Sequence, residues 1–291
     1  MILYNGVSVE ELVYSTAHAS AYIALAMLLL GIAKFALDYL TPFSVDDQLS
    51  AKDNPAFGVS LIGYYLGTLI VYIGVTQGEV PEALAMHWAL AIDFAWAVGG
   101  IVLLNGSRVV LDKLVLGEFS TRKELIEDRN VGMGAVEFAT YIATALIIAG
   151  AMSGGGGGIL TALAFFGLGQ VTLIVLSFVY QKLTPYDFRA EIERDNVAAG
   201  VAYAGNIICV GVVLMRGTAG DFISWKYNLV EFGWYAAAAL GILTIGRFAI
   251  DALLLPGRTL KQEIVDDRNV NAGYLEGGVL VGLAGVIAFL G

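Results

Sequence analysis

Four carboxyl side chains stand in or beside long runs of apolar residues, where acids are rare. Asp93, Glu137 and Glu276 lie well inside such runs, and Glu231 lies near the start of another. An acid within lipid costs about a few kcal/mol, so it normally faces a bundle interior, pairs with a base or stays protonated. A carboxyl group held in such surroundings can also carry a proton or bind a cation. These four residues are therefore our candidates for proton or cation binding.

Two of these acids occupy repeated positions. Glu137 and Glu276 are 139 residues apart, and each follows an asparagine by seven residues. Asp93 and Glu231 depart from the same spacing by one residue. At about 1.5 Å per helical residue, we place Asp93 and Glu137 about 12 Å apart in depth. Acids at stepped depths would suit a path for protons or cations.

The same acids have a structural interpretation. Glu137 could pair with Arg108, whose long side chain can reach inward, and Glu276 with Arg247. Each arginine is also one helical turn from an acid, so local pairs are a second alternative. The residues that could pair or gate are Arg108, Asp112, Arg247 and Asp251.

The composition indicates which kind of protein must position these residues. Hydrophobic residues make up 58% of the 291, charged residues make up 14%, and the mean hydropathy is +0.75. Soluble domains carry roughly 25% charged residues and could not bury so much apolar surface. A single cysteine excludes a disulfide scaffold, and a net charge of −10 argues against nucleic acid. We therefore expect an integral membrane protein whose main partner is the lipid bilayer.

Eight apolar stretches are long enough to cross a bilayer as helices. The predicted spans are 15–37, 55–76, 84–106, 131–152, 159–181, 197–216, 229–250 and 270–290. Fourteen of the sixteen Lys and Arg residues lie at or after the first, third, fifth and seventh spans. By the positive-inside rule these connections are cytoplasmic and both termini lie outside.

The chain repeats itself on either side of a run of five glycines, Gly154–Gly158. The segment from Arg108 to Val131 has a counterpart 139 residues later, from Arg247 to Val270. We therefore predict two parallel four-helix repeats, residues 1–153 and 159–291. Residues 154–158 should be a flexible linker or a loose turn.

A finer repeat makes each half a pair of helical hairpins. An asparagine opens every even-numbered span, and a glycine follows it four residues later. Asparagine caps helix starts, and small residues let membrane helices pack closely, so we expect the even-numbered helices to form the inner layer. The hairpin motif comprises Asp53, Asn54, Asp128, Asn130, Asp195, Asn196, Asp267 and Asn269.

With these motifs, the sequence resembles the bacterial YjfL-like inner-membrane family, catalogued as domain of unknown function 350. The resemblance rests on the Asn-x3-Gly hairpins at 54, 130, 196 and 269 and covers nearly the whole chain. It implies an all-α, multipass protein of the bacterial cytoplasmic membrane with duplicated domains. Its relatives tend to be encoded near stress-response genes, and the family brings no established activity.

Function must therefore be inferred from the charges. The sequence has no phosphate-binding loop, nucleophile elbow or paired-histidine zinc motif, so we expect no enzyme, metal or cofactor. Our first hypothesis is a proton-linked transporter of ions or small cations that uses the intramembrane acids. The alternative is a scaffold without transport activity that docks a cytoplasmic stress-response protein through the charged connections. Either protein could form a homo-oligomer.

Overall fold

The computed structural model describes residues 9–79, 84–111, 122–255 and 257–290, and 84% of these described residues are helical. Eight helices are long and apolar enough to cross a membrane, which confirms the eight predicted spans. They are α1 (Val9–Leu40), α2 (Pro55–Val75), α3 (Met86–Leu111), α4 (Val131–Met152), α5 (Ile159–Leu183), α7 (Val197–Thr218), α8 (Trp225–Ala249) and α9 (Val270–Leu290). The ends differ from the predicted ones by a few residues. α3 runs on to Leu111 because no helix breaker follows its expected end.

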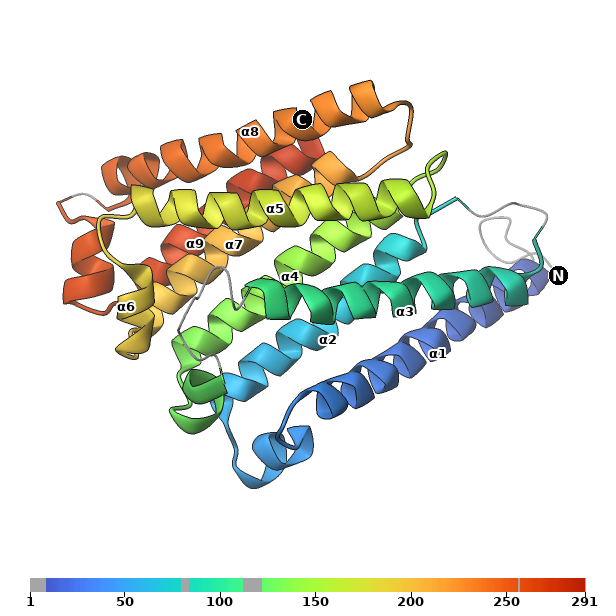
Figure 1. Cartoon of the computed structure of the whole chain (residues 1–291), viewed down its shortest axis with the longest axis horizontal. Helices are drawn as coiled ribbons and strands as arrows, with labels where there is room; N and C mark the ends of the chain where they lie inside the picture. The colour runs from blue at the N-terminus through green and yellow to red at the C-terminus, as the bar shows by residue number, and fades with distance from the viewer. Residues whose placement is uncertain (1–8, 80–83, 112–121, 256, 291) are drawn as a thin grey trace.

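A short helix precedes each even-numbered span and lies just before its capping asparagine. These one-turn or two-turn helices are η1 (Asp47–Ala51), η3 (Lys123–Glu127), α6 (Phe188–Glu193) and η5 (Gln262–Asp266). A further turn, η4 (Ile250–Leu254), continues α8. All of them lie at the end of the bundle where the four asparagines stand, which we call the capped end. The opposite end, which holds Gly154–Gly158, is the glycine end (Figure 1).

The helices form two layers. The inner row runs α2, α4, α7, α9, and each of these helices packs along the next one. The outer helices α1, α3, α5 and α8 lie against this row, as Figure 1 shows from the outer side. The predicted inner layer of even-numbered spans is thereby confirmed.

Glycines bring the inner helices into backbone contact. Gly134, Gly200 and Gly273, each four residues after a capping asparagine, face the backbone of the preceding inner helix. A Cβ at Gly200 would lie only 2.5 Å from the Cα of Gly132. Only glycine permits this approach, which is how membrane helices associate closely. Because α4 and α7 meet in the same way as the other pairs, the row continues unbroken from the first half into the second.

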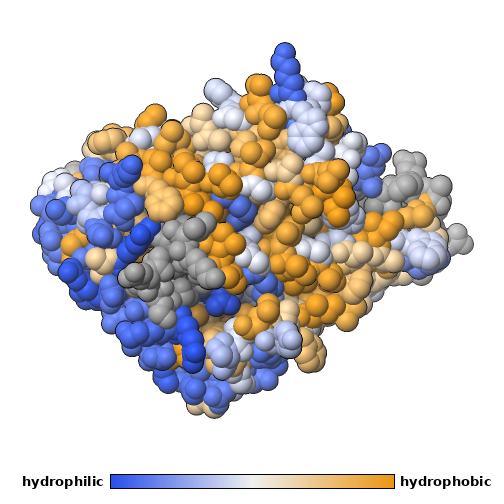
Figure 2. All heavy atoms as spheres, viewed as in Figure 1, coloured by the Kyte–Doolittle hydropathy of each residue, from blue (hydrophilic) through white to orange (hydrophobic). Residues whose placement is uncertain are grey.

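The surface matches a membrane environment. Figure 2 shows a broad hydrophobic band across the helices, with hydrophilic residues gathered at the capped end. Leu28, Phe35, Val102, Ile245 and Phe248 are all more than half exposed. Such a surface is stable in lipid and would aggregate in water.

Candidate functional site

The two acids at repeated positions lie in the interior, each beside an arginine. Glu137 is 3% exposed, and its Oε2 accepts a hydrogen bond of 2.9 Å from the Ser60 hydroxyl. Its Oε1 lies 3.5 Å from Nε of Arg108. The space beside these side chains measures only about 10 Å³, room for at most one water molecule. α2, α3 and α4 thus hold Glu137 in a packed, ion-paired site.

In the second half, Glu276 is buried more deeply and has more partners. It is 0% exposed, and its Oε1 lies 3.1 Å from Nη1 of Arg247. The hydroxyl of Tyr180 donates to the same oxygen over 3.4 Å. Arg247 also donates to the Thr184 hydroxyl and stacks over the ring of Tyr186. Both repeated acids are therefore paired with the arginines that the structural interpretation of the sequence named.

The other predicted residues include Glu231, a candidate for proton or cation binding, and the two aspartates of the suggested local pairs. Glu231 lies at the glycine end, where its Oε1 is 3.7 Å from Nη1 of Arg216. Asp251 accepts a hydrogen bond of 2.7 Å from the backbone N–H of Leu260. Arg247 turns inward to Glu276, so the suggested local pair of Arg247 with Asp251 is not the one formed. Asp112 lies outside the described residues.

The capping asparagines do more than the sequence indicated. The side-chain oxygen of each accepts a backbone N–H of its own helix, as expected of a cap. The side-chain amide of Asn54, Asn130 and Asn196 also donates to a carbonyl of the next hairpin, over 2.9, 2.6 and 2.8 Å respectively. Each asparagine therefore fastens one hairpin to its neighbour.

A glutamate or glutamine completes each of these caps, a partner that was not predicted from the sequence. The amide groups of the four asparagines donate to Gln48, Glu124, Glu191 and Glu263. These residues stand five or six positions before the asparagine. That spacing recurs in all four hairpins and was the signal available in the sequence.

The residue directly before each asparagine has a left-handed backbone. These are Asp53, Arg129, Asp195 and Arg268, with φ between 45° and 57°. The other two motif aspartates pair with bases: Asp128 with Lys123, and Asp267 with Arg258, both at 2.9 Å. The motif aspartates thus shape the turn into the inner helix, which is a structural function.

The five-glycine run is an ordered strap across the glycine end. Its backbone forms hydrogen bonds with residues on both sides, namely Gln77, Glu79, Asp221 and Phe222. Gly154 and Gly156 have φ of 85° and 75°, which side chains rarely permit. The expected linker connects α4 to α5, and the hydrogen bonds of Gly154 and Gly155 hold its first part against the neighbouring segments, where a loose turn was predicted.

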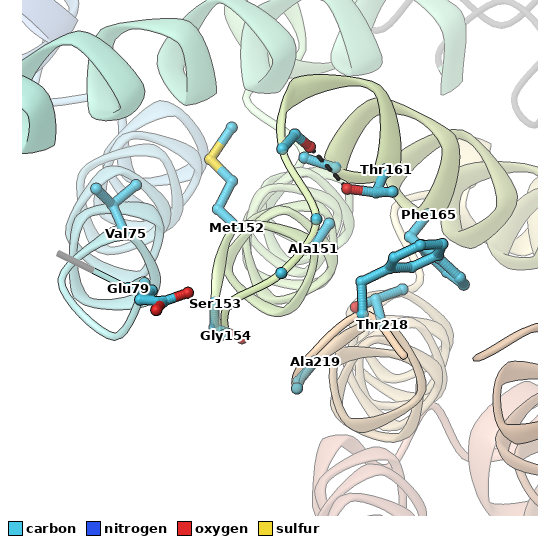
Figure 3. Close-up of a pocket in the computed structure, with 18 of the residues that line it drawn as sticks. Val75, Glu79, Ala151, Met152, Ser153, Gly154, Thr161, Phe165, Thr218 and Ala219 are labelled. Carbon is cyan, nitrogen blue, oxygen red and sulfur yellow. Dashed lines mark hydrogen bonds between the residues drawn. The ribbon is translucent and has the colours of Figure 1, made fainter. Parts of the chain in front are cut away.

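Beneath this strap lies a cavity of about 310 Å³ between the two halves. α2, α3 and α4 contribute to its wall from the first half, and α5, α7 and α8 from the second. In Figure 3, Val75 and Met152 stand on one side, Phe165 and Thr218 on the other, and Glu79 points towards the strap. The cavity is large enough for a small ligand.

Asp93 of α3 lines this cavity and is 2% exposed. Thr161, Thr218 and Asn228 also line it, but their side chains form hydrogen bonds with nearby backbone. Within the described part of the chain, the carboxyl group of Asp93 has no hydrogen-bond or ion-pair partner. A buried carboxylate without a partner is costly, so this group is suited to bind a proton or a cation.

The structure does not bring the intramembrane acids together. Asp93 lies near the glycine end, whereas Glu137 and Glu276 lie near the capped end. Of the described residues, none lines both the cavity at Asp93 and the small space at Glu137. The close contact of α4 with α7 also fills the interface between the halves below the cavity. The predicted stepped path is therefore not continuous in this conformation.

Comparison with known proteins gives one family. The chain matches the family described as Domain of Unknown Function (DUF350) over residues 8–152 and again over residues 156–290. The two matches coincide with the two four-helix halves. No curated protein and no solved structure matches the chain.

Proposed function

This chain belongs to the DUF350 family and carries two tandem copies of its domain, and we propose from this premise that it transports protons or small cations across a membrane. The observation that carries the proposal is the buried carboxyl group of Asp93 in the cavity between the halves, which has no hydrogen-bond or ion-pair partner among the described residues. In this proposal Asp93 is the group that receives the transported ion. The protein is a transporter and not an enzyme.

The other acids have a supporting function in this proposal. Arg108 with Glu137, and Arg247 with Glu276, brace the inner helices near the capped end. Transport then requires α4 and α7 to separate below the cavity, because their glycine contacts close it in this conformation. An alternating opening of two packed halves is a common transporter motion.

The orientation and location belong to the same proposal. Basic residues gather at the capped end, so this end faces the cytoplasm of a bacterial cell by the positive-inside rule. The described chain begins and ends at the glycine end (Figure 1). In this proposal both termini therefore lie outside. The cavity at Asp93 is then open to the outer side of the cytoplasmic membrane.

Ion flux into proteoliposomes tests the proposal. We expect Asp93→Asn to lower proton or cation flux at least tenfold, with the folded protein recovered at the parent's yield. Glu231→Gln is the matched control, because this acid is also at the glycine end but pairs with Arg216. If Asp93→Asn moves every tested ion as fast as the parent, Asp93 is not the binding group and the proposal fails.

A scaffold that docks a cytoplasmic protein is the second candidate, and the charged capped end favours it (Figure 2). Arg122, Glu127 and Arg129 are exposed there. Reversing the charges of Arg122 and Glu127 should abolish capture of a partner if this end is a docking surface. Capture that persists in the reversed variant would argue against the scaffold.

A further inference from the structure

An apolar groove runs between α3 and α5, the two outer helices on either side of the boundary between the halves. Its volume is about 320 Å³, and apolar side chains and glycine line it. α3 packs on α1, α2 and α4, whereas α5 packs on α4, α7 and α8, which leaves the groove between them. Ala95, Gly99 and Leu163 on its walls are exposed. The groove therefore faces the lipid.

The groove lies next to the cavity under the glycine strap, and the two share part of their walls. Trp96, Ala151, Met152 and Ala162 line both spaces. The polar part at Asp93 therefore adjoins an apolar part that opens sideways between α3 and α5.

The charged residues of the polar part determine which charge a bound ligand should carry. Glu79 and Asp93 both line it, and no Lys, Arg or His is found among its described lining residues. An anionic or phosphate-bearing head group would meet two carboxylates and no base there. A cationic head group would give the buried Asp93 a counter-charge that none of the described residues supplies.

We propose that this site binds a single-chain organic ammonium ion, with the ammonium group at Asp93 and the hydrocarbon chain in the groove between α3 and α5. The proposal rests on the proposed function and specifies its substrate as an amphipathic cation. The chain would enter from the outer part of the lipid layer, because the groove opens to that side.

Calorimetric titration of the protein in nanodiscs tests this, with empty nanodiscs as the blank and free aqueous concentrations as the reference. The ligands are methylammonium, butylammonium, octylammonium and uncharged 1-octanol. We expect roughly fourfold tighter binding for each methylene group that enters the groove, which corresponds to about 0.8 kcal/mol. Asp93→Asn should weaken octylammonium binding at least tenfold, and 1-octanol should bind at least tenfold more weakly than octylammonium.

A variant of Gly99 separates the groove from the cavity. A Cβ at Gly99 meets nothing within 4 Å, so Gly99→Leu can fold while its side chain fills the groove. We expect it to weaken octylammonium binding at least tenfold and leave methylammonium binding unchanged. Gly106→Leu is the matched control, since Gly106 is equally open on the same helix but does not line the groove.

The outcomes distinguish the two proposals. If methylammonium and octylammonium bind equally, or if Gly99→Leu binds octylammonium as the parent does, the amphipathic substrate is wrong. The small-cation proposal then stands on the flux of Asp93→Asn alone. If 1-octanol binds as tightly as octylammonium and Asp93→Asn changes neither, the site is an adventitious lipid groove and this inference fails.

Discussion

Removing one side chain of the Arg247–Glu276 pair leaves a buried charge without its partner. The loss of one member of a buried pair typically costs about 3–5 kcal/mol, whereas replacing both by apolar residues costs much less. We expect Arg247→Met and Glu276→Leu each to destabilise the protein by about that amount, and the double variant to be more stable than either. Thermal unfolding in detergent measures this.

The partly exposed pair of Arg216 and Glu231 is the control for that cycle. Its side chains are 39% and 27% exposed, and such pairs contribute about 0–1 kcal/mol. We expect Arg216→Met to change the stability little. Additive losses in the Arg247 and Glu276 variants would show that the two side chains act independently.

Glu124 gives the capped end a defined pH dependence. Burial raises the pKa of Glu124 above its ordinary value of 4.5, and the hydrogen bond from Asn130 opposes this shift. Between pH 4.5 and the raised pKa, the folded protein binds more protons than the unfolded chain. The free energy of unfolding therefore falls as the pH rises through this window.

Glu124→Gln should remove this dependence. A glutamine can take the same place, because Gln48 accepts the amide of Asn54 in the first hairpin. We expect the variant to be more stable than the parent at pH 7 and similar to it below pH 4.5, as measured by unfolding at a series of pH values. Gln48→Glu should have the opposite effect. A variant that is less stable than the parent at pH 7 would contradict this account.

At the scale of the helices, packing depends on glycines that touch the neighbouring backbone. A methyl group at Gly200 would press on Gly132 of α4, whereas one at Gly58 would meet nothing within 4 Å. We expect Gly200→Ala to destabilise by about 1–3 kcal/mol. Gly58→Ala should stabilise by roughly 0.5–1 kcal/mol, because alanine loses less backbone entropy in a helix. Equal effects at the two positions in thermal unfolding would exclude this explanation.

The helices themselves were largely predictable from the sequence. Hydrophobic length set the eight spans, and the recurrence of asparagine and glycine indicated which helices are inner. The left-handed residues before each asparagine were not foreseen, since aspartate is only moderately enriched in that backbone and arginine carries no signal for it. The amide contacts to the next hairpin join residues 62 to 71 positions apart. Such contacts can be predicted only when the order of the inner helices in the row is known.

The candidate site was predictable only in part. Asp93 was recognised because an acid is rare in an apolar span. That Glu137 and Glu276 are paired, whereas Asp93 is not, depends on which helices adjoin. The strap of Gly154–Gly158 was expected to be loose because glycine alone does not show which neighbours will bind its backbone. Those neighbours come from the ends of α2 and α7.

At the scale of the whole molecule, the two halves should associate even when the chain is cut. The contact of α4 with α7 has the same glycine-based form as the contacts within each half. We expect residues 1–156 and 157–291, expressed as separate chains, to be recovered as a one-to-one complex in affinity purification. Gly200→Leu together with Gly211→Leu should abolish this recovery, since both glycines face α4. Halves that fail to associate without these changes would show that the strap is essential.

Within the described residues the row of inner helices has a direction, with α2 at one edge and α9 at the other. At the last edge, Gly278 and Gly282 of α9 are open, and a Cβ on either would meet nothing within 4 Å. They stand at the same distances from Asn269 as Gly63 and Gly67 from Asn54, which face α4. A further copy of the last hairpin could therefore pack its inner helix against this open face of α9. Duplication of a hairpin would thus lengthen the row through the same glycine-based contact that joins the existing inner helices.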